Sequence, residues 1–276
     1  MPTEAIPTPA WLPWVAGIAV VASGAAVARL IDRSRRGLPL VDRRPHADVP
    51  WEGGDVLVVL LLALACMAMA GSILPPDPPI DRMLAANILA TSVASLLAIG
   101  WLVGRGATAA DLGFIWDRPV DDARLALGGL ALVVAPLLGL AATLDRLVPY
   151  EHPVVEFLLL RRDPWAVGLV LASAVVAAPL VEELFFRRIL QGWLETRLPQ
   201  ADGLGAITIS AAAFALAHQG QGLAYVPLFP LGLVLGILAH RTGSIVPCIL
   251  LHALFNAVSV TLLLASPAPL PTPPAG

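Results

Sequence analysis

The chain has 276 residues, of which 58% are hydrophobic and 13% are charged, with a formal net charge of −3 and a mean hydropathy of +0.81. Water-soluble domains carry about 25% charged and about 45–50% apolar residues. The composition therefore excludes a water-soluble globular protein and predicts a chain embedded in a lipid bilayer. No basic run is interleaved with aromatic residues, so nothing indicates nucleic-acid binding. All 17 basic residues are arginine, which, with the many alanines, suggests a bacterial source.

The first apolar run covers residues 11–31, and we interpret it as a retained transmembrane helix. A cleaved signal peptide would begin with basic residues, whereas Met1–Ala10 contains Glu4 and no arginine. The arginines follow the apolar run instead, at Arg29, Arg33, Arg35 and Arg36. Because positive residues favour the cytoplasmic side, we expect the N-terminus to lie outside.

Seven further apolar runs can each cross much or all of the hydrocarbon core, which is about 30 Å thick. They cover residues 55–74, 83–103, 123–145, 166–190, 203–219, 221–240 and 244–265. We therefore predict an all-α fold, a polytopic transmembrane helix bundle of about eight spans. Residues 266–276 contain five prolines and are predicted to form a disordered tail.

Arginines concentrate in alternate loops, which all fall on one side of the predicted bundle. The loops after the first, third, fifth and seventh spans carry them, whereas the loop after the fourth span is a weaker exception. By the positive-inside rule the arginine-rich side is cytoplasmic. We expect an integral protein of the bacterial inner (plasma) membrane.

The second half of the chain places charged residues inside an apolar run, where each costs about 2.5–3.5 kcal/mol on insertion scales. Glu183 and Arg187 are four residues apart, so they share a helical face and can form an ion pair. Glu182 points elsewhere and has Phe186 at the matching position, so it stays unpaired. An unpaired carboxylate suits a general base or acid. The alternative is that the helix has left the membrane and that both glutamates are solvated.

Two later runs carry the other polar residues. His218 ends an alanine-rich run, where a histidine alone is usually an interfacial residue. His252 and Asn256 are four residues apart on one face, which also suits polar contacts between helices. Together with the carboxylates and Arg187, these residues supply a base, an orienting group and oxyanion donors, the set that a hydrolase needs.

Three short motifs occur in order: Glu-Glu-x-x-x-Arg at residues 182–187, Phe-x-x-x-His at 214–218 and His-x-x-x-Asn at 252–256. In this arrangement the chain resembles the CPBP intramembrane proteases, which include the Ras-converting CAAX endopeptidase and the Abi proteins linked to bacteriocin self-immunity. The resemblance covers residues 165–262. It divides the chain into N-terminal transmembrane helices (1–145) and a protease core (146–265). The remaining histidines, His46, His152 and His240, match no motif and are expected in loops or at interfaces.

The resemblance implies an intramembrane endopeptidase that cleaves membrane-associated peptides or proteins. In this scheme Glu182 and His218 activate a water molecule, and His252 and Asn256 stabilise the oxyanion. Glu183 and Arg187 have a supporting role. We expect no obligatory metal; if zinc is used, its candidate ligands are His218 and His252.

One difficulty is depth, because a fifth span ending near residue 190 leaves the three motifs at different levels in the membrane. We expect that span to shift about two turns, to end near Gly192–Leu194. Two other functions stay open. One is a catalytically silent immunity or scaffold protein of the same fold, and the other is a proton-coupled transporter, whose intramembrane Glu and His residues would relay protons.

Overall fold

A computed structural model describes residues 9–148, 153–198 and 202–265, and all regular structure in them is helical. The all-α prediction is confirmed. The elements are α1 (Leu12–Arg35), α2 (Gly53–Ile73), α3 (Ile80–Gly104), α4 (Pro119–Asp145), α5 (Pro153–Leu160), α6 (Pro164–Val170), η1 (Leu171–Ala177), α7 (Ala178–Glu182), η2 (Glu183–Leu190), α8 (Gln191–Arg197), α9 (Leu204–Leu216), α10 (Tyr225–Thr242) and α11 (Val246–Ala265). The predicted tail, residues 266–276, lies outside the described residues.

Within the described residues, seven helices are long and apolar enough to cross a membrane. They are α1, α2, α3, α4, the continuous helix 164–197, α10 and α11. The predicted span at 203–219 is instead the 13-residue helix α9. At 1.5 Å per residue α9 is about 20 Å long, which is short of the hydrocarbon thickness. The prediction of a polytopic bundle is confirmed, and the described residues contain seven candidate spans where about eight were predicted.

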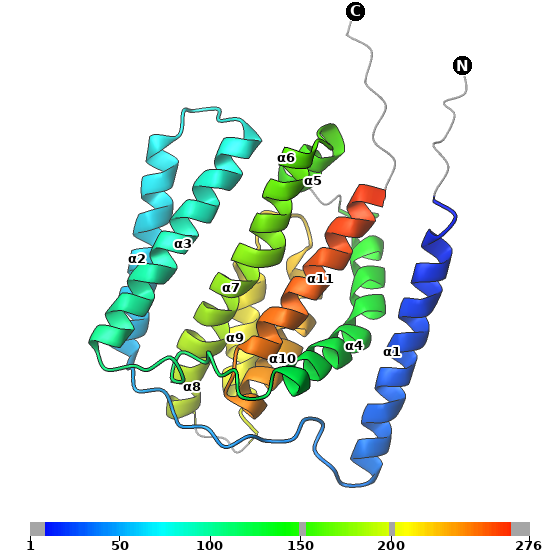
Figure 1. Ribbon diagram of the computed structural model, residues 1–276, viewed down its shortest axis with the longest axis vertical. Helices are drawn as coiled ribbons and strands as arrows, with labels where there is room; N and C mark the ends of the chain where they lie inside the picture. Colours follow the sequence, from blue (N-terminus) through cyan, green and yellow to red (C-terminus); the bar gives the residue numbers. More distant parts are fainter. Residues whose placement is uncertain (1–8, 149–152, 199–201, 266–276) are drawn as a thin grey trace, which may run out of the picture.

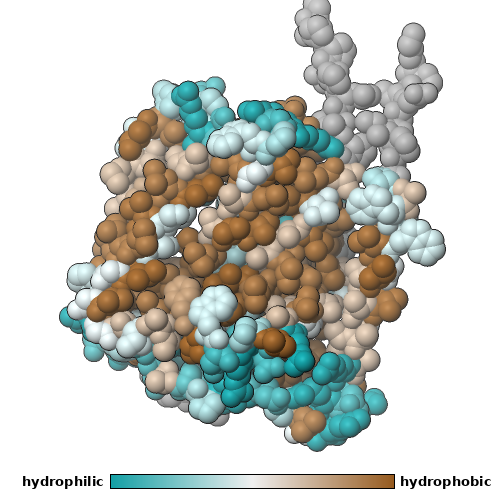
Figure 2. All heavy atoms as spheres, in the orientation of Figure 1, coloured by the Kyte–Doolittle hydropathy of each residue, from teal (hydrophilic) through white to brown (hydrophobic). Residues whose placement is uncertain are grey.

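The outer surface is that of an integral membrane protein. A broad apolar band lies between hydrophilic ends (Figure 2). Exposed tryptophans lie near both ends of the helices: Trp14 and Trp165 at the starts of α1 and α6, Trp101 and Trp116 around the α3–α4 connection. Tryptophan is enriched at both membrane interfaces. The loops α1–α2 and α3–α4, which carry many of the arginines, lie at the same end of the bundle (Figure 1).

The helix 164–197 is longer than predicted. It begins where the Asp163 side chain accepts a bond from the N–H of Ala166 at 3.2 Å. We expected it to end at residue 190, or near Leu194 after the shift, but it continues to Arg197. The reason is that its polar residues find partners inside the protein: Gln191 donates to Gly236 O at 2.9 Å and Glu195 pairs with His240 at 3.1 Å.

Two stretches of this helix, η1 and η2, are π-helical. Their hydrogen bonds close over five residues, from Ala178 N–H to Ser173 O and from Gln191 N–H to Phe186 O. π-Helical turns are rare and occur often at functional sites. The second widened turn adjoins Glu182, since α7 ends at this residue and η2 begins at the next, whereas η1 ends five residues earlier, at Ala177.

The loop between α1 and α2, residues 36–52, crosses the arginine-rich end of the bundle (Figure 1). Its backbone N–H at Arg44 donates to Arg241 O at 2.8 Å. The Arg44 guanidinium also pairs with Asp122 at 2.6 Å, and the Asp122 side chain is fully buried. The loop therefore ties the N-terminal helices to α4 and α10. The division of the chain at residue 145 stays a prediction.

Helices α9 and α10 pack closely because α10 carries glycine at their contact. A Cβ added at Gly232 would lie 3.1 Å from Ala211 Cα, and one at Gly236 would lie 2.9 Å from Ile207 Cγ2. Glycines four residues apart let two helix backbones approach in a membrane. This contact fixes α9, the helix that leads to His218, against the core.

Candidate active site

Three elements bring the predicted site residues together. The long helix carries Glu182, Glu183 and Arg187. His218 follows the end of α9, and α11 carries His252 and Asn256. The site therefore lies where these three helices meet inside the bundle.

Glu183 lies at the centre of a buried charged network. Its carboxylate pairs with Arg187 Nε at 3.0 Å and accepts a hydrogen bond from His252 Nδ1 at 2.8 Å. The Glu183 and Arg187 side chains are both 0% exposed, and that of His252 is 3% exposed. The predicted Glu183–Arg187 ion pair is confirmed. Because Glu183 is fully buried and partnered, the alternative of two solvated glutamates is wrong.

Of the two adjacent glutamates, Glu182 is the one without a hydrogen-bond partner in the described part of the chain. Its Oε2 atom is buried, and this atom lies 3.9 Å from His252 Nε2. The side chain as a whole is 24% exposed, so it is less enclosed than Glu183. A separation of 3.9 Å is too long for a direct hydrogen bond but is one that a water molecule can bridge.

His218 is held by its own turn and by an aromatic ring. Its Nδ1 lies 2.9 Å from Phe214 O, and its ring meets the Phe214 ring edge-on at 5.1 Å. Phe214 also contacts the His252 ring at 5.7 Å, and the Arg187 guanidinium lies 4.7 Å from its centroid. The buried Phe214 ring thus separates and orients the two histidines. His218 is close enough to Glu182 to interact with it electrostatically.

Asn256 faces the long helix. Its side-chain Nδ2 donates to Ala174 O, in the π-helical segment η1, at 2.8 Å. A side-chain amide carries two N–H hydrogens, so this bond commits one of them. Asn256 therefore holds η1 in place one turn along α11 from His252.

The first two motifs lie at a common depth once the real helix ends are used. Glu183 is 14 residues before Arg197, and His218 is 14 residues after Leu204. At 1.5 Å per residue both lie about 20 Å from the arginine-rich end. The predicted conflict in depth between these two motifs came from ending the fifth span too early. His252, six residues after the start of α11, joins them through its 2.8 Å contact with Glu183.

Sequence reasoning gave no role to two of the residues that build this site. Ser210 accepts from Arg187 Nη1 at 3.3 Å and donates to Phe186 O at 2.7 Å. Phe214 was recognised only as the first residue of the Phe-x-x-x-His motif, without a role in the site. Ser210, Phe214 and His218 are spaced by four residues, so they lie on one face of α9 and its continuation. This four-residue spacing was the feature of the sequence from which the contributions of Ser210 and Phe214 could have been predicted.

His240, expected in a loop or at an interface, is in fact buried beside Glu195.

The residues present do not form a complete zinc site. In the described ranges, no three His, Cys, Asp or Glu side chains gather closely enough to hold a metal ion. His252 already uses Nδ1 toward Glu183, and His218 directs Nδ1 to a backbone carbonyl.

The fold and this site define a class: an integral membrane protein whose helices enclose a carboxylate, histidine and arginine network. Residues 164–258 match the family model described as Type II CAAX prenyl endopeptidase Rce1-like. The match begins at the first residue of α6, ends within α11 and contains all six predicted site residues. Over these residues the match confirms the family resemblance that the three motifs indicated. No curated protein and no solved structure matches the chain.

Proposed function

We propose that the protein is an intramembrane endopeptidase that hydrolyses peptide bonds of membrane-associated substrates. The observation that carries the proposal is the unpartnered Glu182 carboxylate beside a histidine that a second carboxylate orients. A base that is free to take a proton, next to a fixed imidazole, is the arrangement that water activation requires.

In the proposed reaction a water molecule between Glu182 and the histidines attacks the carbonyl carbon of the scissile bond. Glu182, with His218, takes a proton from the water as the new C–O bond forms. His252 and Asn256 donate hydrogen bonds to the oxyanion. The C–N bond then breaks, and the proton held at Glu182 passes to the leaving amine.

Glu183 and Arg187 orient His252. A Glu183 carboxylate that is paired with Arg187 can only accept, so His252 must carry its proton on Nδ1. Which ring nitrogen is protonated is set by the bond that the other nitrogen makes. His252 therefore directs Nε2 toward Glu182 and the reacting atoms. The form that stabilises the oxyanion is the imidazolium, which keeps Nδ1–H on Glu183 and donates Nε2–H to the oxyanion.

The proposed setting is the bacterial inner membrane, with the site reached from the cytoplasmic, arginine-rich end. The substrate is a membrane-associated peptide or protein, and no nucleic acid takes part. The proposed reaction uses the protein's own side chains and no cofactor. The competing functions, a silent immunity or scaffold protein and a proton-coupled transporter, predict no proteolysis.

The test uses purified full-length protein in proteoliposomes with a quenched fluorescent peptide whose cysteine near the C-terminus is prenylated. Removing the base with Glu182→Gln is expected to lower kcat by about 10²–10⁴-fold, the usual range for a general base. The matched control is Glu156→Gln in α5, an exposed glutamate outside the site. Activity is expected to survive a zinc chelator.

Three results would count against the proposal. Equal activity of Glu182→Gln and wild type removes Glu182 as the base, and loss of activity with the chelator shows that a metal is needed. If the prenylated peptide is not cut, membrane-associated peptides from cells expressing wild type and Glu182→Gln are compared. Identical peptide sets in those two cell populations would contradict an endopeptidase.

A further inference from the structure

We propose that Ser210 and Trp51 are positioning residues that hold η2 in its π-helical register, and so keep Glu183 against His252. Both donate hydrogen bonds to backbone carbonyls of η2 from other elements. The inference deepens the proposed function and rests on it, because it concerns how the same site is assembled.

The register of η2 decides whether the site forms. A π-helical turn contains one more residue than an α-helical turn, and each residue of an α-helix turns about 100°. Without the π register, α8 would therefore rotate by about 100° relative to Glu182 and Glu183. Because Gln191 and Glu195 fix α8 to α10, the carboxylates would be the groups that turn away from His252.

Ser210 ties η2 to α9 and to the buried ion pair. Its hydroxyl donates to Phe186 O at 2.7 Å and accepts from Arg187 Nη1 at 3.3 Å. Phe186 O is also the carbonyl that closes the five-residue bond from Gln191 N–H. Ser210 is fully buried, so water cannot replace this donor without a rearrangement of the helices.

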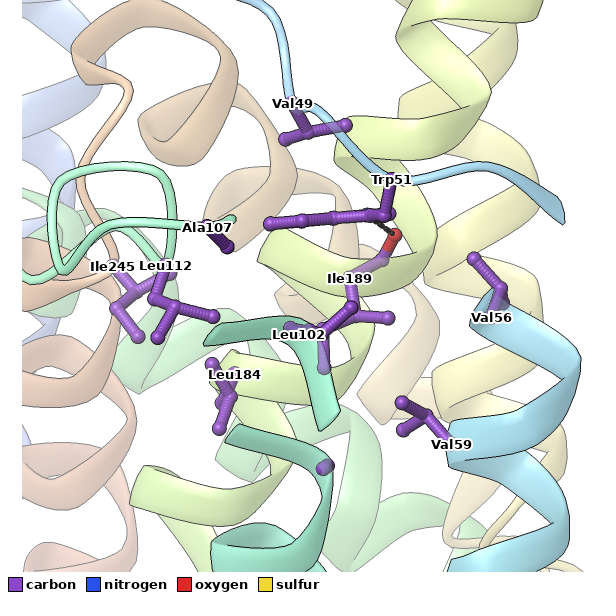
Figure 3. Close-up of a cluster of buried hydrophobic side chains, with 11 residues drawn as sticks. Val49, Trp51, Val56, Val59, Leu102, Ala107, Leu112, Leu184, Ile189 and Ile245 are labelled. Atoms are coloured by element: carbon purple, nitrogen blue, oxygen red, sulfur yellow. Dashed lines mark hydrogen bonds between the residues drawn. The ribbon is translucent and has the colours of Figure 1, made fainter. Parts of the chain in front are cut away.

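Trp51, in the N-terminal half of the chain, contacts the same segment η2. Its indole Nε1 donates to Ile189 O at 3.1 Å, as the dashed line in Figure 3 shows. Trp51 is 4% exposed and packs in one apolar cluster with Leu102 and Ala107. It lies in the loop 36–52, outside the family-matched residues 164–258. The N-terminal half therefore contributes directly to the geometry of the site.

The first experiment removes the Ser210 hydroxyl in full-length protein in proteoliposomes. Ser210→Ala is expected to lower kcat about 10–100-fold with KM within twofold, since a displacement of about 1 Å can cost about 100-fold. Ser210→Thr keeps a hydroxyl and should recover most of kcat. The matched control is Ser259→Ala in α11, whose hydroxyl donates to Phe255 O within its own helix.

The second experiment removes one indole N–H and keeps an aromatic ring. Trp51→Phe is expected to lower kcat several-fold. Trp193→Phe is the matched control, because the buried Trp193 Nε1 has no hydrogen-bond partner in the described part of the chain. Trp193→Phe should retain wild-type kcat.

Amide hydrogen exchange provides a readout that does not depend on activity. Exchange over residues 184–192 is expected to rise at least tenfold in Ser210→Ala and Trp51→Phe, with α11 unchanged. If Ser210→Ala and Trp51→Phe both keep wild-type kcat and wild-type exchange over residues 184–192, the inference is overturned. The proposed function is decided separately, by the kcat of Glu182→Gln. Exchange that rises equally throughout the bundle would also overturn it, since it would show a general loss of structure.

Discussion

The buried charges of the site stabilise one another only as a set. Glu183, Arg187 and His252 share two short contacts in a region where their side chains are 0–3% exposed. An isolated buried charge costs several kcal/mol, and a pair compensates for this only when its hydrogen bonds are complete. Removing one member therefore leaves an uncompensated charge among apolar side chains.

We predict that Glu183→Gln destabilises the protein by about 3–5 kcal/mol, because it leaves the Arg187 guanidinium buried without its carboxylate. Replacing both partners, as Glu183→Gln with Arg187→Met, should recover most of the stability but not the activity. Thermal unfolding in detergent micelles measures both effects. Glu156→Gln is the control, and equal stability of Glu183→Gln and wild type would show that the pair carries no such role.

Residue spacing was sufficient to predict the Glu183–Arg187 ion pair and to leave Glu182 outside it. Glu183 and Arg187 are four residues apart, and Glu182 has Phe186 at the matching position, so local helical geometry decided both. The contact of Glu183 with His252 joins residues 69 positions apart and could not be predicted from local spacing. The same holds for Trp51, whose partner Ile189 is 138 positions away.

At the scale of elements, α9 is the unusual helix, because it is too short to span the bilayer and ends at the level of the site. Irregular backbone at membrane depth is tolerated where it is buried in protein or lines a polar cavity. The turn that follows α9 carries His218, so the short helix places this candidate catalytic residue near the middle of the membrane-spanning bundle. The close contact with α10 then fixes that depth.

We predict that Gly232→Val in α10 lowers both stability and kcat. A Cβ there would lie 3.1 Å from Ala211 Cα and 3.3 Å from Phe214 Cδ1, so a branched side chain must push α9 and the Phe214 ring away. Overpacking of this kind costs about 1–3 kcal/mol. Gly168→Val in α6 is the control, since a Cβ at Gly168 has no neighbour within 4 Å. Similar unfolding temperatures and kcat values for the two variants would contradict the prediction.

Hydropathy predicted which segments are helices but not where the functional helices end. Helix 164–197 continues through Arg187, Gln191 and Glu195 because tertiary partners satisfy these residues, and hydropathy scores each position without its partners. The π-helical turns could not be predicted, because no repeating pattern of apolar residues distinguishes them from the α-helical turns around them. The close α9–α10 contact did have a signal, because Gly232-Leu-Val-Leu-Gly236 is a Gly-x-x-x-Gly pattern.

At the scale of the whole molecule, the two halves are joined at the arginine-rich end. The loop 36–52 bonds α10 through Arg44, pairs with Asp122 of α4 and reaches η2 through Trp51. The family match does not include this loop, although the loop contacts the helix that carries both carboxylates. The loop therefore lies at the arginine-rich end of the bundle, about 20 Å along the long helix from Glu183.

Arginine asymmetry predicts that this end faces the cytoplasm, and single-cysteine labelling in intact bacterial cells tests it. In a background with Cys66 and Cys248 replaced by alanine, Asp77→Cys lies in the α2–α3 loop and Asp117→Cys in the α3–α4 loop, both exposed and at opposite ends of α3. A membrane-impermeant maleimide should label Asp77→Cys in intact cells and Asp117→Cys only after the membrane is opened. The reverse pattern would place the arginine-rich end, and with it the approach to Glu182, on the outer side of the membrane.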